Sequence, residues 1–592
     1  MNSELPTLTS SPNVNHLWAA LLVEELVRQG TTLFVVCPGS RSTPLAVAVA
    51  QNPHAEALVH WDERAAGFVA LGWAKATGRP AAVVTTSGTA VANLLPAAVE
   101  ARQSGVPLLL LTADRPPELR EAGANQAIRQ PGLFSTVARW AFDLGTPSSE
   151  IDPAFVLTTV AEAVTRTHDG GPVHLNLPFR EPLAPTPDGT DVDALLAPLA
   201  RWLDGDDPYT RRARPPSHPE VRDLAHLLDG GERGLVVLGP LPADDAETAP
   251  AAAEIAERLG WPLVADLLSG VGHGAPRAFD LALASDRLRE IVPEAVLHVG
   301  GRPTSKRLAR WTADARPGLY VRVHPDRARL DPAHRVTHRL TGEPGPVARA
   351  LAAALADQGS RRPIAPPDGW RARWQTAVDA AHDAADAVLA ASGLSEPVVA
   401  RALAESLPKG AGLVAAASMP VRDLDTFAAG GSAVVVTANR GASGIDGTVA
   451  TAAGFARGRG LPTALLIGDL ALLHDQTSLA LLRDGPPVVV VVVNNDGGGI
   501  FHQLPVAESL DETTFERVFG TPHGLGFEAA ARQVGLRYAA PTTPDAFEAA
   551  LTDAVASGTS SVIEVRTDRR EQADLRRRIV AAVAEAVDAA LA

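Results

Sequence analysis

The sequence is poor in several features that mark common classes of protein. Cys37 is the single cysteine, so no disulfide can form within the chain, which fits a reducing cytoplasm. The formal net charge of −15 argues against the basic surface of a nonspecific nucleic-acid binder. The longest apolar run, at 486–493, is far too short to cross a bilayer. We therefore expect a cytoplasmic protein with neither nucleic-acid binding nor membrane insertion.

The 592 residues are too many for one hydrophobic core. Short apolar runs alternate with helix-like stretches along the chain, and each run ends in a polar or glycine-containing loop. This alternation predicts the α/β class, with three doubly wound parallel sheets in three domains. We place the domains at 1–190, 215–355 and 372–592, and we predict linkers in the proline-rich stretches Pro182–Pro219 and Asp357–Trp370.

Two strand ends in the last domain carry residues suited to a metal ion. Asp469 follows one apolar run, a helix is expected at 476–483, and Asn495 follows the next run. Ligands bind at the carboxyl ends of parallel strands, and two hard oxygen ligands there suit Mg²⁺ shared with phosphates. The glycines at 497–499 would let the backbone approach a diphosphate closely. The alternative is that Asp469 caps a helix and that the glycines form an ordinary turn.

The spacing of this pair resembles the signature of thiamine diphosphate enzymes, in which "GD" and "NN" are separated by 24 residues, as they are here. The resemblance implies that thiamine diphosphate is the cofactor. It also implies Mg²⁺ (or Mn²⁺) held by Asp469, Asn495 and the carbonyl of Gly497. Residues 1–190 would then be the pyrimidine-binding domain, 215–355 a central domain and 372–592 the pyrophosphate-binding domain. Leu470 departs from the generic signature, which often has glycine there.

Such enzymes also need a glutamate in the pyrimidine-binding domain. In the family this residue hydrogen-bonds the aminopyrimidine ring and promotes the tautomer that generates the reactive ylid. Glu63 fits this role, since it follows the strand-like "ALVHWD" and precedes the small and apolar residues of "RAAGFVALGWAKATG". An apolar setting would strengthen the hydrogen bond of the Glu63 carboxyl to the ring.

Five loops at strand ends narrow the resemblance to one branch: "CPGSRSTPL", "HWDERAAGF", "TSGTAVANLLPA", "LLTADRPPELREAGANQAI" and "NRGASGIDG". Together they resemble the 2-succinyl-5-enolpyruvyl-6-hydroxy-3-cyclohexene-1-carboxylate synthase family of menaquinone biosynthesis, and Leu470 agrees with that branch. The resemblance implies decarboxylation of 2-oxoglutarate and 1,4-addition of the succinyl unit to isochorismate, with release of CO2.

Both substrates of that family are dicarboxylates, which arginine side chains bind through two parallel hydrogen bonds. Carried over motif by motif, the resemblance implies catalytic roles for Glu63, Arg41 and Gln126. The substrate-binding residues it implies are Ser40, Arg41, Arg115, Asn125, Gln126, Lys306, Arg307, Arg422, Arg440, Phe501 and Leu504. Besides Glu63 and the metal ligands, the cofactor-binding residues it implies are Ser418, Ile445, Ile500 and Phe501.

Two other interpretations remain open from the sequence. Another thiamine enzyme, such as an acetolactate-synthase-like carboligase or a 2-oxoacid decarboxylase, would share Glu63 and the metal motif but has little need of so many arginines. A non-catalytic metabolite binder that kept the fold would be expected to lose Glu63 or the Asp469 and Asn495 pair. In the superfamily the glutamate and the metal motif meet across a subunit interface, so the resemblance implies a homodimer or homotetramer.

Overall fold

The computed structural model describes residues 6–211, 220–270, 278–326, 328–357, 369–428 and 434–592. Its strands form three sheets in which every pairing is parallel. The predicted α/β class with three parallel sheets is thereby confirmed. The chain divides into two compact units: unit 1 holds 1–214, 439–460 and 477–481, and unit 2 holds 215–438, 461–476 and 482–592. The bounds of the three domains remain predictions.

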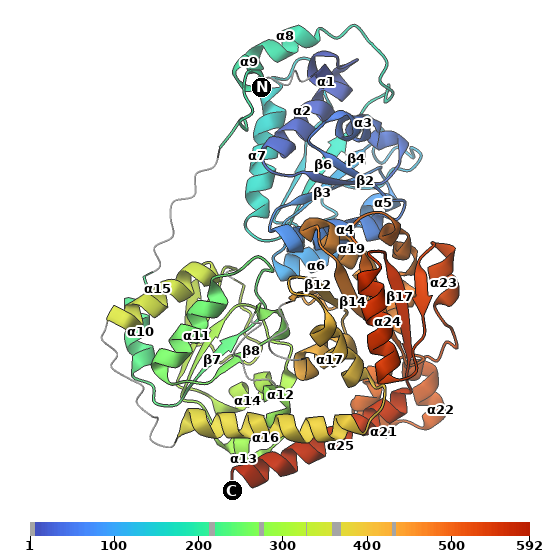
Figure 1. Ribbon diagram of the computed structural model, residues 1–592. Helices are drawn as coiled ribbons and strands as arrows, with labels where there is room; N and C mark the ends of the chain where they lie inside the picture. The colour runs from blue at the N-terminus through green and yellow to red at the C-terminus, as the bar shows by residue number, and fades with distance from the viewer. Residues whose placement is uncertain (1–5, 212–219, 271–277, 327, 358–368, 429–433) are drawn as a thin grey trace. The chain divides into compact units, whose positions relative to one another are not determined.

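Unit 1 contains one six-stranded sheet with the strand order β2-β1-β3-β4-β6-β5 (Figure 1). Its strands are β1 (Leu33–Val36), β2 (Glu56–Val59), β3 (Ala81–Thr85), β4 (Leu108–Asp114), β5 (Trp140–Asp143) and β6 (Pro172–Pro178). Its α-helices are α1 (Pro6–Thr9), α2 (Val14–Arg28), α3 (Thr43–Gln51), α4 (Glu63–Thr77), α5 (Thr89–Ala92), α6 (Leu95–Ser104), α7 (Ala154–Thr167), α8 (Val192–Leu196), α9 (Ala200–Leu203) and α19 (Thr448–Arg459).

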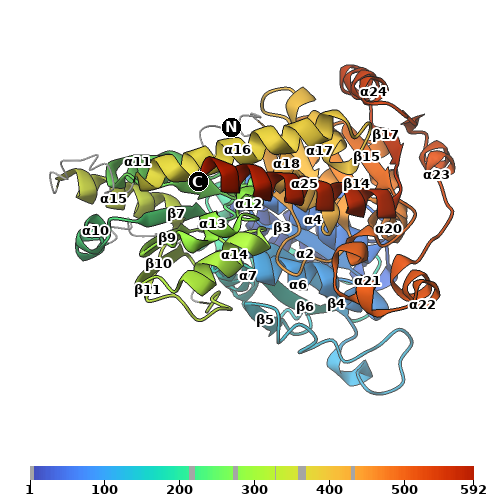
Figure 2. The same ribbon diagram turned by 90° about the horizontal axis from the view of Figure 1, so that it is seen from below.

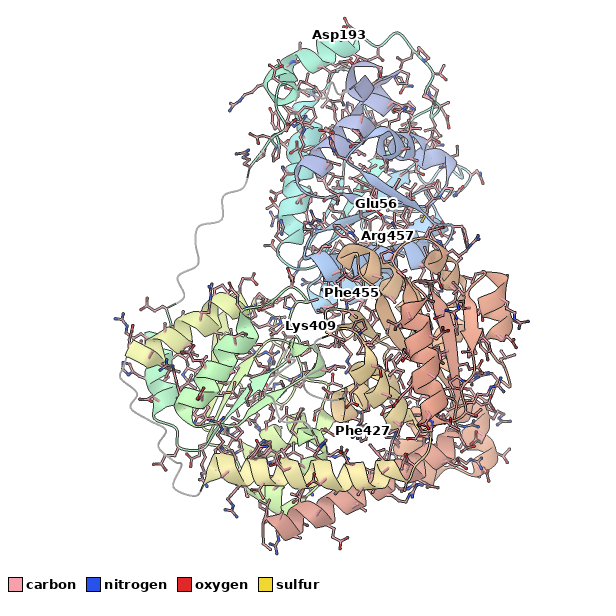
Figure 3. All side chains as sticks on the ribbon, viewed as in Figure 1. Glu56, Asp193, Lys409, Phe427, Phe455 and Arg457 are labelled. Carbon is pink, nitrogen blue, oxygen red and sulfur yellow. The ribbon has the colours of Figure 1, made fainter. Side chains whose placement is uncertain are left out.

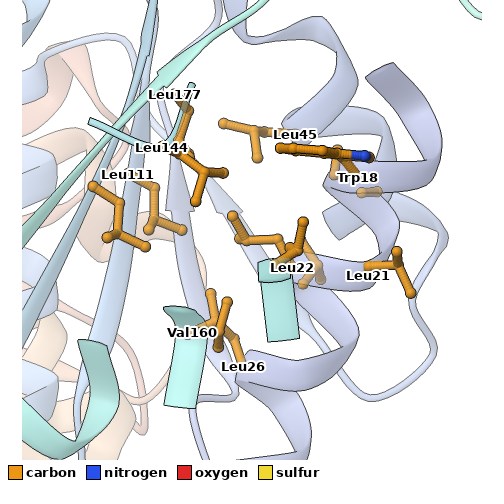
Figure 4. Close-up of a cluster of buried hydrophobic side chains, with 14 of the residues drawn as sticks. Trp18, Leu21, Leu22, Leu26, Leu45, Leu111, Leu144, Val160 and Leu177 are labelled. Atoms are coloured by element: carbon orange, nitrogen blue, oxygen red, sulfur yellow. The ribbon is translucent and has the colours of Figure 1, made fainter. Parts of the chain in front are cut away.

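Both faces of this sheet are buried, because successive side chains of a strand point to opposite faces. On β1, Phe34 and Val36 join a core with α2 and α7, whereas Leu33 and Val35 join a second core with α4 and α6. Figure 4 shows part of the first core, where leucines of α2 meet leucines of the sheet and Val160 of α7. The near-continuous apolar strands of the sequence are explained by this two-sided burial.

The first predicted linker differs from the structure over its described part. Residues 212–219 lie outside the described residues, but Leu183, Leu196 and Trp202 are buried in the first core of unit 1. Trp202 also donates an indole hydrogen bond to the buried Glu25 at 2.9 Å. The prolines of this stretch therefore separate short helices that pack on the domain, and they do not mark a free tether. In the second predicted linker, α15 ends at Asp357 and α16 begins at Trp370, and 358–368 lie outside the described residues.

Unit 2 contains the other two sheets, with the orders β11-β10-β9-β7-β8 and β13-β12-β14-β15-β17-β16. The strands are β7 (Gly234–Leu238), β8 (Leu263–Ala265), β9 (Ala295–Val299), β10 (Leu319–His324), β11 (His338–Thr341), β12 (Gly412–Ala415), β13 (Val435–Ala438), β14 (Thr463–Gly468), β15 (Val488–Asn494), β16 (Arg537–Ala539) and β17 (Ser561–Arg566). The α-helices are α10 (Arg222–Asp229), α11 (Thr248–Leu259), α12 (Phe279–Ala282), α13 (Asp286–Glu290), α14 (Lys306–Ala315), α15 (Pro344–Asp357), α16 (Trp370–Ala390), α17 (Glu396–Ser406), α18 (Met419–Phe427), α20 (Asp469–His474), α21 (Val506–Ser509), α22 (Glu512–Phe515), α23 (Glu528–Gln533), α24 (Pro544–Ala556) and α25 (Arg569–Ala590).

Two long helices join the parts of unit 2. Helices α16 and α25 lie side by side (Figure 2), and Trp374 and Ile579 share one core with Trp311 of α14. The helix predicted at 476–483 is present as the 3-10 helix η5 (Gln476–Arg483). Within the described ranges, no helix is both long enough and apolar enough to span a membrane.

Candidate active site

Two buried arginines lie at strand ends of unit 1. Arg41 is in the 3-10 helix η1 (Ser40–Ser42) beyond β1, and Arg115 directly follows β4, so both lie at the carboxyl edge of the sheet. Arg41 donates to the Phe179 carbonyl at 2.9 Å and pairs with the exposed Glu181, while its buried Nε has no hydrogen-bond partner among the described residues. Burial lowers the pKa of Arg41, and the neighbouring Arg115 guanidinium lowers it further. The pair therefore forms a concentrated positive charge.

Arg115 is held by the same loops that position Gln126. It donates to Ser87 Oγ at 2.8 Å and to the Asn125 carbonyl at 2.6 Å. Ser87 in turn donates to the Gln126 carbonyl, and Gln126 Nε2 returns a bond to the Ser87 carbonyl at 3.0 Å. Gln126 has a φ of 54°, which is uncommon for a residue other than glycine and typical of functional sites. The structure thus brings Arg115, Asn125 and Gln126 together, with Ser40 exposed at the start of η1.

Glu63 is the first residue of α4. The preceding Asp62 caps this helix by accepting the backbone N–H groups of Arg64 and Ala65, so the two acids have different roles. Glu63 is half-buried and accepts a long hydrogen bond from Asn93 Nδ2 at 3.4 Å. Burial and then the charges of Glu63 and Asp62 raise the pKa of Cys37, which places the thiol near both acids.

The small residues after Glu63 make a close helix contact possible. A Cβ on Gly72 of α4 would lie 2.1 Å from the Thr451 carbonyl oxygen of α19, and one on Gly454 would lie 1.9 Å from the Val69 carbonyl oxygen. Only glycine, which has no Cβ, lets two helix backbones approach each other this closely. At the end of α19, Arg457 also pairs with Glu56 of β2 at 2.6 Å, and Figure 3 labels both residues.

The loop that carries Arg440 and Ile445 leads into α19. The backbone N–H groups of Gly441 and Ala442 donate hydrogen bonds to the carboxylate of the buried Glu100, at 2.9 and 2.7 Å. Glu100 also lies 3.7 Å from the buried Lys75 ammonium group. Arg440 is half-buried, and the Ile445 side chain is 37% exposed, so an apolar surface is available there.

The predicted metal ligands come together in unit 2. Strands β14 and β15 pair in register from Thr463 to Gly468, so Asp469 and Asn495 follow neighbouring strand ends. Asp469 Oδ2 accepts the Gly497 N–H at 2.9 Å, and its Oδ1 accepts the Leu470 N–H at 2.6 Å. Burial raises the pKa of the Asp469 carboxyl. The described residues contain no cluster of three or more His, Cys, Asp or Glu side chains suited to a metal, and Asp469 is the carboxylate of the predicted ligand set.

The backbone conformation at position 497 requires glycine. Its φ is 135°, and a Cβ there would lie 1.9 Å from the Gly520 carbonyl oxygen. The Gly497 carbonyl accepts the Gly499 N–H at 3.0 Å, which leaves its second lone pair free. Gly497 therefore leaves no room for a side chain here, and its N–H lies at the Asp469 carboxylate.

The two neighbouring asparagines have different environments. Asn494 uses its whole amide: Nδ2 donates to Glu564 and to the Leu525 carbonyl, and Oδ1 accepts the Asp496 N–H. Asn495 Nδ2 donates to Glu396 Oε1 at 2.8 Å, but its Oδ1 is buried and has no hydrogen-bond partner in the described chain. An unpaired buried oxygen is costly unless a ligand completes it, so the donor set fits a hard cation at Asn495.

His523 supports Asp469 from a distant loop. Its Nδ1 accepts the Leu525 N–H at 3.0 Å, so the proton is on Nε2, which lies 3.2 Å from Asp469 Oδ2 and donates to it. The sequence predicted neither this histidine nor Ser87 and Glu396. Ser87 belongs to the quoted "TSGTA" loop and could have been found there. His523 and Glu396 lie 54 and 99 residues from the ligands that they touch, and no local pattern connects them.

The remaining predicted residues fall into three groups in unit 2. Ser418, before α18, has φ 71° and ψ −126°, and its carbonyl accepts Arg422 Nη1. Lys306 and Arg307 begin α14, where Lys306 is exposed and Arg307 pairs with Asp280 at 2.6 Å. Ile500 and Phe501 lie in the 3-10 helix η6 (Gly499–Gln503) and are half-buried. Leu504 follows this helix and is exposed.

Three family models match the chain in succession. Residues 18–133 match the N-terminal TPP binding domain of thiamine pyrophosphate enzymes, and residues 424–565 match their C-terminal TPP binding domain. Residues 193–414 match a model described as the middle domain of thiamine pyrophosphate. The first and last matches contain Glu63 and the Asp469 and Asn495 pair, respectively.

Curated relatives match over nearly the whole chain. A protein of Rubrobacter xylanophilus is 54% identical over 96% of this chain and 98% of its own length. Proteins of Salinibacter ruber and Chlorobaculum tepidum are 49% and 42% identical over 98% and 97% of this chain, covering 99% and 98% of their own lengths. All three are named 2-succinyl-5-enolpyruvyl-6-hydroxy-3-cyclohexene-1-carboxylate synthase. The chain therefore belongs to the 2-succinyl-5-enolpyruvyl-6-hydroxy-3-cyclohexene-1-carboxylate synthase family of thiamine diphosphate-dependent enzymes.

Proposed function

We propose that this enzyme decarboxylates 2-oxoglutarate and adds the succinyl unit to isochorismate in a 1,4-addition that forms a menaquinone precursor. The product would be 2-succinyl-5-enolpyruvyl-6-hydroxy-3-cyclohexene-1-carboxylate, with CO2 released, in the cytoplasm. The observation that carries the choice of substrates is the buried pair Arg41 and Arg115 at the strand ends of unit 1.

Two like charges that are both buried repel each other unless an anion lies between or beside them. Glu181 compensates Arg41 from the surface, since its side chain is 67% exposed, and the buried Asp114 also raises the Arg41 pKa. Arg41 Nε has no acceptor among the described residues and is left for a ligand. Guanidinium groups bind carboxylates through paired, directed hydrogen bonds. A dicarboxylate therefore matches this pair, whereas pyruvate would neutralise less of its charge.

The pyrophosphate side of the cofactor would be held through Mg²⁺ (or Mn²⁺). Asp469 Oδ1, Asn495 Oδ1 and the Gly497 carbonyl are the proposed ligands, because each has a lone pair that the protein does not use. Thiamine diphosphate, when bound, supplies the carbanion equivalent that carries the succinyl unit. His523 keeps Asp469 oriented by donating to Oδ2.

Glu63 is the proposed proton-handling residue of the chain. Its carboxylate, at the start of α4, would hydrogen-bond a nitrogen of the aminopyrimidine ring of the cofactor. It would move a proton at that nitrogen. Gln126 and Arg41 would orient the reacting carboxylates. The further proposed contacts are Ser40, Asn125, Lys306, Arg307, Arg422, Arg440 and Leu504 to the substrates, and Ser418, Ile445, Ile500 and Phe501 to the cofactor.

The proposed assembly is a homodimer or a homotetramer. The family resemblance, in which Glu63 and the metal ligands belong to different protomers of one site, supports it. Symmetric homo-oligomers of this kind repeat each shared site by symmetry.

The test is a reconstitution with thiamine diphosphate, Mg²⁺ and 2-oxoglutarate, with and without isochorismate, followed by the absorbance of isochorismate. We expect isochorismate to be consumed only when every component is present. Omission of Mg²⁺ and replacement of 2-oxoglutarate by pyruvate are the controls. Rapid turnover of pyruvate alone would contradict the proposal and favour an acetolactate-synthase-like carboligase.

A further inference from the structure

A buried ion network lies directly behind the unpaired amide oxygen of Asn495. Glu396, at the start of α17, accepts Asn495 Nδ2 on Oε1 at 2.8 Å and Arg576 Nη2 on Oε2 at 2.9 Å. Arg576 of α25 also pairs with Asp423 of α18. The side chains of Glu396 and Asp423 are each 4% exposed, and that of Arg576 is 12% exposed.

Arg576 is the cation of this network, although burial raises the pKa of its partner Asp423 to about 6. Burial opposes the charge of Arg576, but Asp423 and Glu396 outweigh it and raise the pKa of the guanidinium. Arg576 is therefore a cation that only donates hydrogen bonds. Thr567 Oγ1 lies 3.4 Å from Glu396 Oε1, and the Glu396 backbone N–H donates to Gln572 Oε1. Hydrogen bonds therefore hold both the backbone and the carboxylate of Glu396.

A carboxylate next to an asparagine determines whether the amide nitrogen or the amide oxygen points away from it. Glu396 can only accept hydrogen bonds, so it must face Nδ2, and Oδ1 then points to the opposite side. Rotation of the Asn495 amide by half a turn would set its oxygen against the Glu396 carboxylate. The unpaired buried oxygen is thus a direct consequence of the charge on Glu396.

We propose that Glu396, itself held by Arg576, is a positioning residue that keeps Asn495 Oδ1 turned toward the metal ion. Glu396 touches neither metal nor substrate in this scheme and acts through the amide alone. The inference rests on the proposed function, since it takes Asn495 as a metal ligand.

The neighbouring asparagine provides a matched comparison. Glu564 is also a fully buried glutamate, and its Oε1 accepts Asn494 Nδ2 at 2.8 Å. Asn494 Oδ1, however, accepts the Asp496 N–H, whereas Asn495 Oδ1 has no hydrogen-bond partner among the described residues. This glutamate therefore holds an asparagine that is not a proposed metal ligand. Both pairs join a buried glutamate to an asparagine Nδ2, although Glu564 also accepts the Phe527 N–H and the Tyr538 hydroxyl, and Glu396 accepts Arg576. We expect only the Glu396 pair to affect the metal.

The variant Glu396→Gln separates orientation from size, because the side chains are isosteric. Arg576 requires an oxygen, so the introduced amide turns its oxygen to Arg576 and its NH2 to Asn495. Asn495 must then rotate and present Nδ2, which cannot bind a cation. Changes in residues that orient metal ligands lower metal affinity about 10- to 100-fold, and we expect a loss in this range.

A second change should restore binding. When Asn495→Asp is made together with Glu396→Gln, the new carboxylate can accept the introduced NH2 with one oxygen and offer the other to the metal. The double variant also keeps the net charge of the pair. A residue that merely stabilised the fold would not be rescued in this way.

The experiment measures Mn²⁺ binding from the electron paramagnetic resonance signal of the free ion, with thiamine diphosphate present and no substrate. We expect wild type and Glu564→Gln to bind Mn²⁺ similarly, Glu396→Gln to bind weakly, and the double variant to recover. Circular dichroism confirms that each variant is folded. The inference would be overturned if Glu396→Gln bound Mn²⁺ with wild-type affinity, or if a folded double variant bound it as weakly as Glu396→Gln. Either result would leave the proposed function intact. Absence of Mn²⁺ binding by wild type would overturn the proposed ligand set as well.

Discussion

Identical residue types acquire different roles through their partners. Asn494 and Asn495 are adjacent, yet Asn494 Oδ1 accepts a backbone N–H, whereas the buried Asn495 Oδ1 has no hydrogen-bond partner among the described residues. The neighbouring acids Asp62 and Glu63 also differ, since Asp62 caps α4 while Glu63 accepts a long hydrogen bond from the Asn93 amide. At this scale the hydrogen-bond partners decide which side chain remains available for chemistry.

Replacing Glu63 tests the proposed proton-handling role. The substitution Glu63→Gln keeps the size of the side chain but removes the acid, so we expect kcat to fall about 10²- to 10⁴-fold, the usual contribution of general acid–base catalysis. Steady-state kinetics with both substrates measure the effect. Glu56→Gln, on β2, loses an ion pair with Arg457 of α19, and this variant is the control that should remain active. Near-normal kcat in Glu63→Gln would remove this residue from the mechanism.

His174 should make the stability of unit 1 depend on pH. Burial lowers its pKa to about 4, with Thr112 Oγ1 at 2.7 Å and the ring of Phe134 beside it. The unfolded chain therefore takes up a proton between about pH 6.5 and pH 4 that the folded chain does not. Stability from this source is complete above pH 6.5 and falls by about 3 kcal/mol as the pH drops to 4.

The free energy of unfolding in urea, measured across this pH range, checks the effect. The variant His174→Gln should lose less stability on acidification than wild type. The exposed His338→Gln, on β11, should behave like wild type. Equal pH dependence in His174→Gln and wild type would contradict the assignment.

At the scale of elements, the contact of α4 with α19 depends on glycine. Because Gly454 has an ordinary helical backbone, alanine alone would favour the helix by about 1 kcal/mol. The added Cβ would however lie 1.9 Å from a backbone oxygen, which a side-chain rotation cannot relieve. We expect Gly454→Ala to be destabilising overall, by about 1–3 kcal/mol, as for other overpacked cores.

Thermal unfolding measures this effect. Gly318→Ala is the control, since a Cβ at Gly318 meets no heavy atom within 4 Å and its φ is not positive. The control should be neutral or slightly stabilising. A stabilised Gly454→Ala variant would mean that the two helices separate easily, against the close contact described above.

At the scale of the whole molecule, the proposed oligomer predicts complementation between inactive chains. Glu63→Gln and Asp469→Asn chains with different tags are coexpressed, and the mixed oligomer is purified through both tags. If each site takes Glu63 from one protomer and Asp469 from another, one site of the mixed pair is intact and activity reappears. Each homo-oligomer should be inactive, and an inactive mixed oligomer would contradict shared sites.

Strong apolar runs made most strands predictable. The runs that became β4, β6 and β15 are buried on both faces, so their sequences are almost wholly apolar. The strands β5, β11 and β16 lie at sheet edges, and exposed residues interrupt them. An edge strand has one neighbour and less burial, which weakens its apolar signal. The signal is not always lost, since the strand-like "ALVHWD" overlaps the edge strand β2.

The three parallel sheets, the family resemblance and the residue types of the candidate site were predictable from the amino-acid sequence. Burial on both faces and ligand binding at strand ends leave local patterns in the chain. The orientation of these residues depends on tertiary packing. Glu396 and Asn495 are 99 residues apart, and the direction of one amide depends on a carboxylate that another helix supplies. Such contacts arise from packing between distant segments and leave no local pattern.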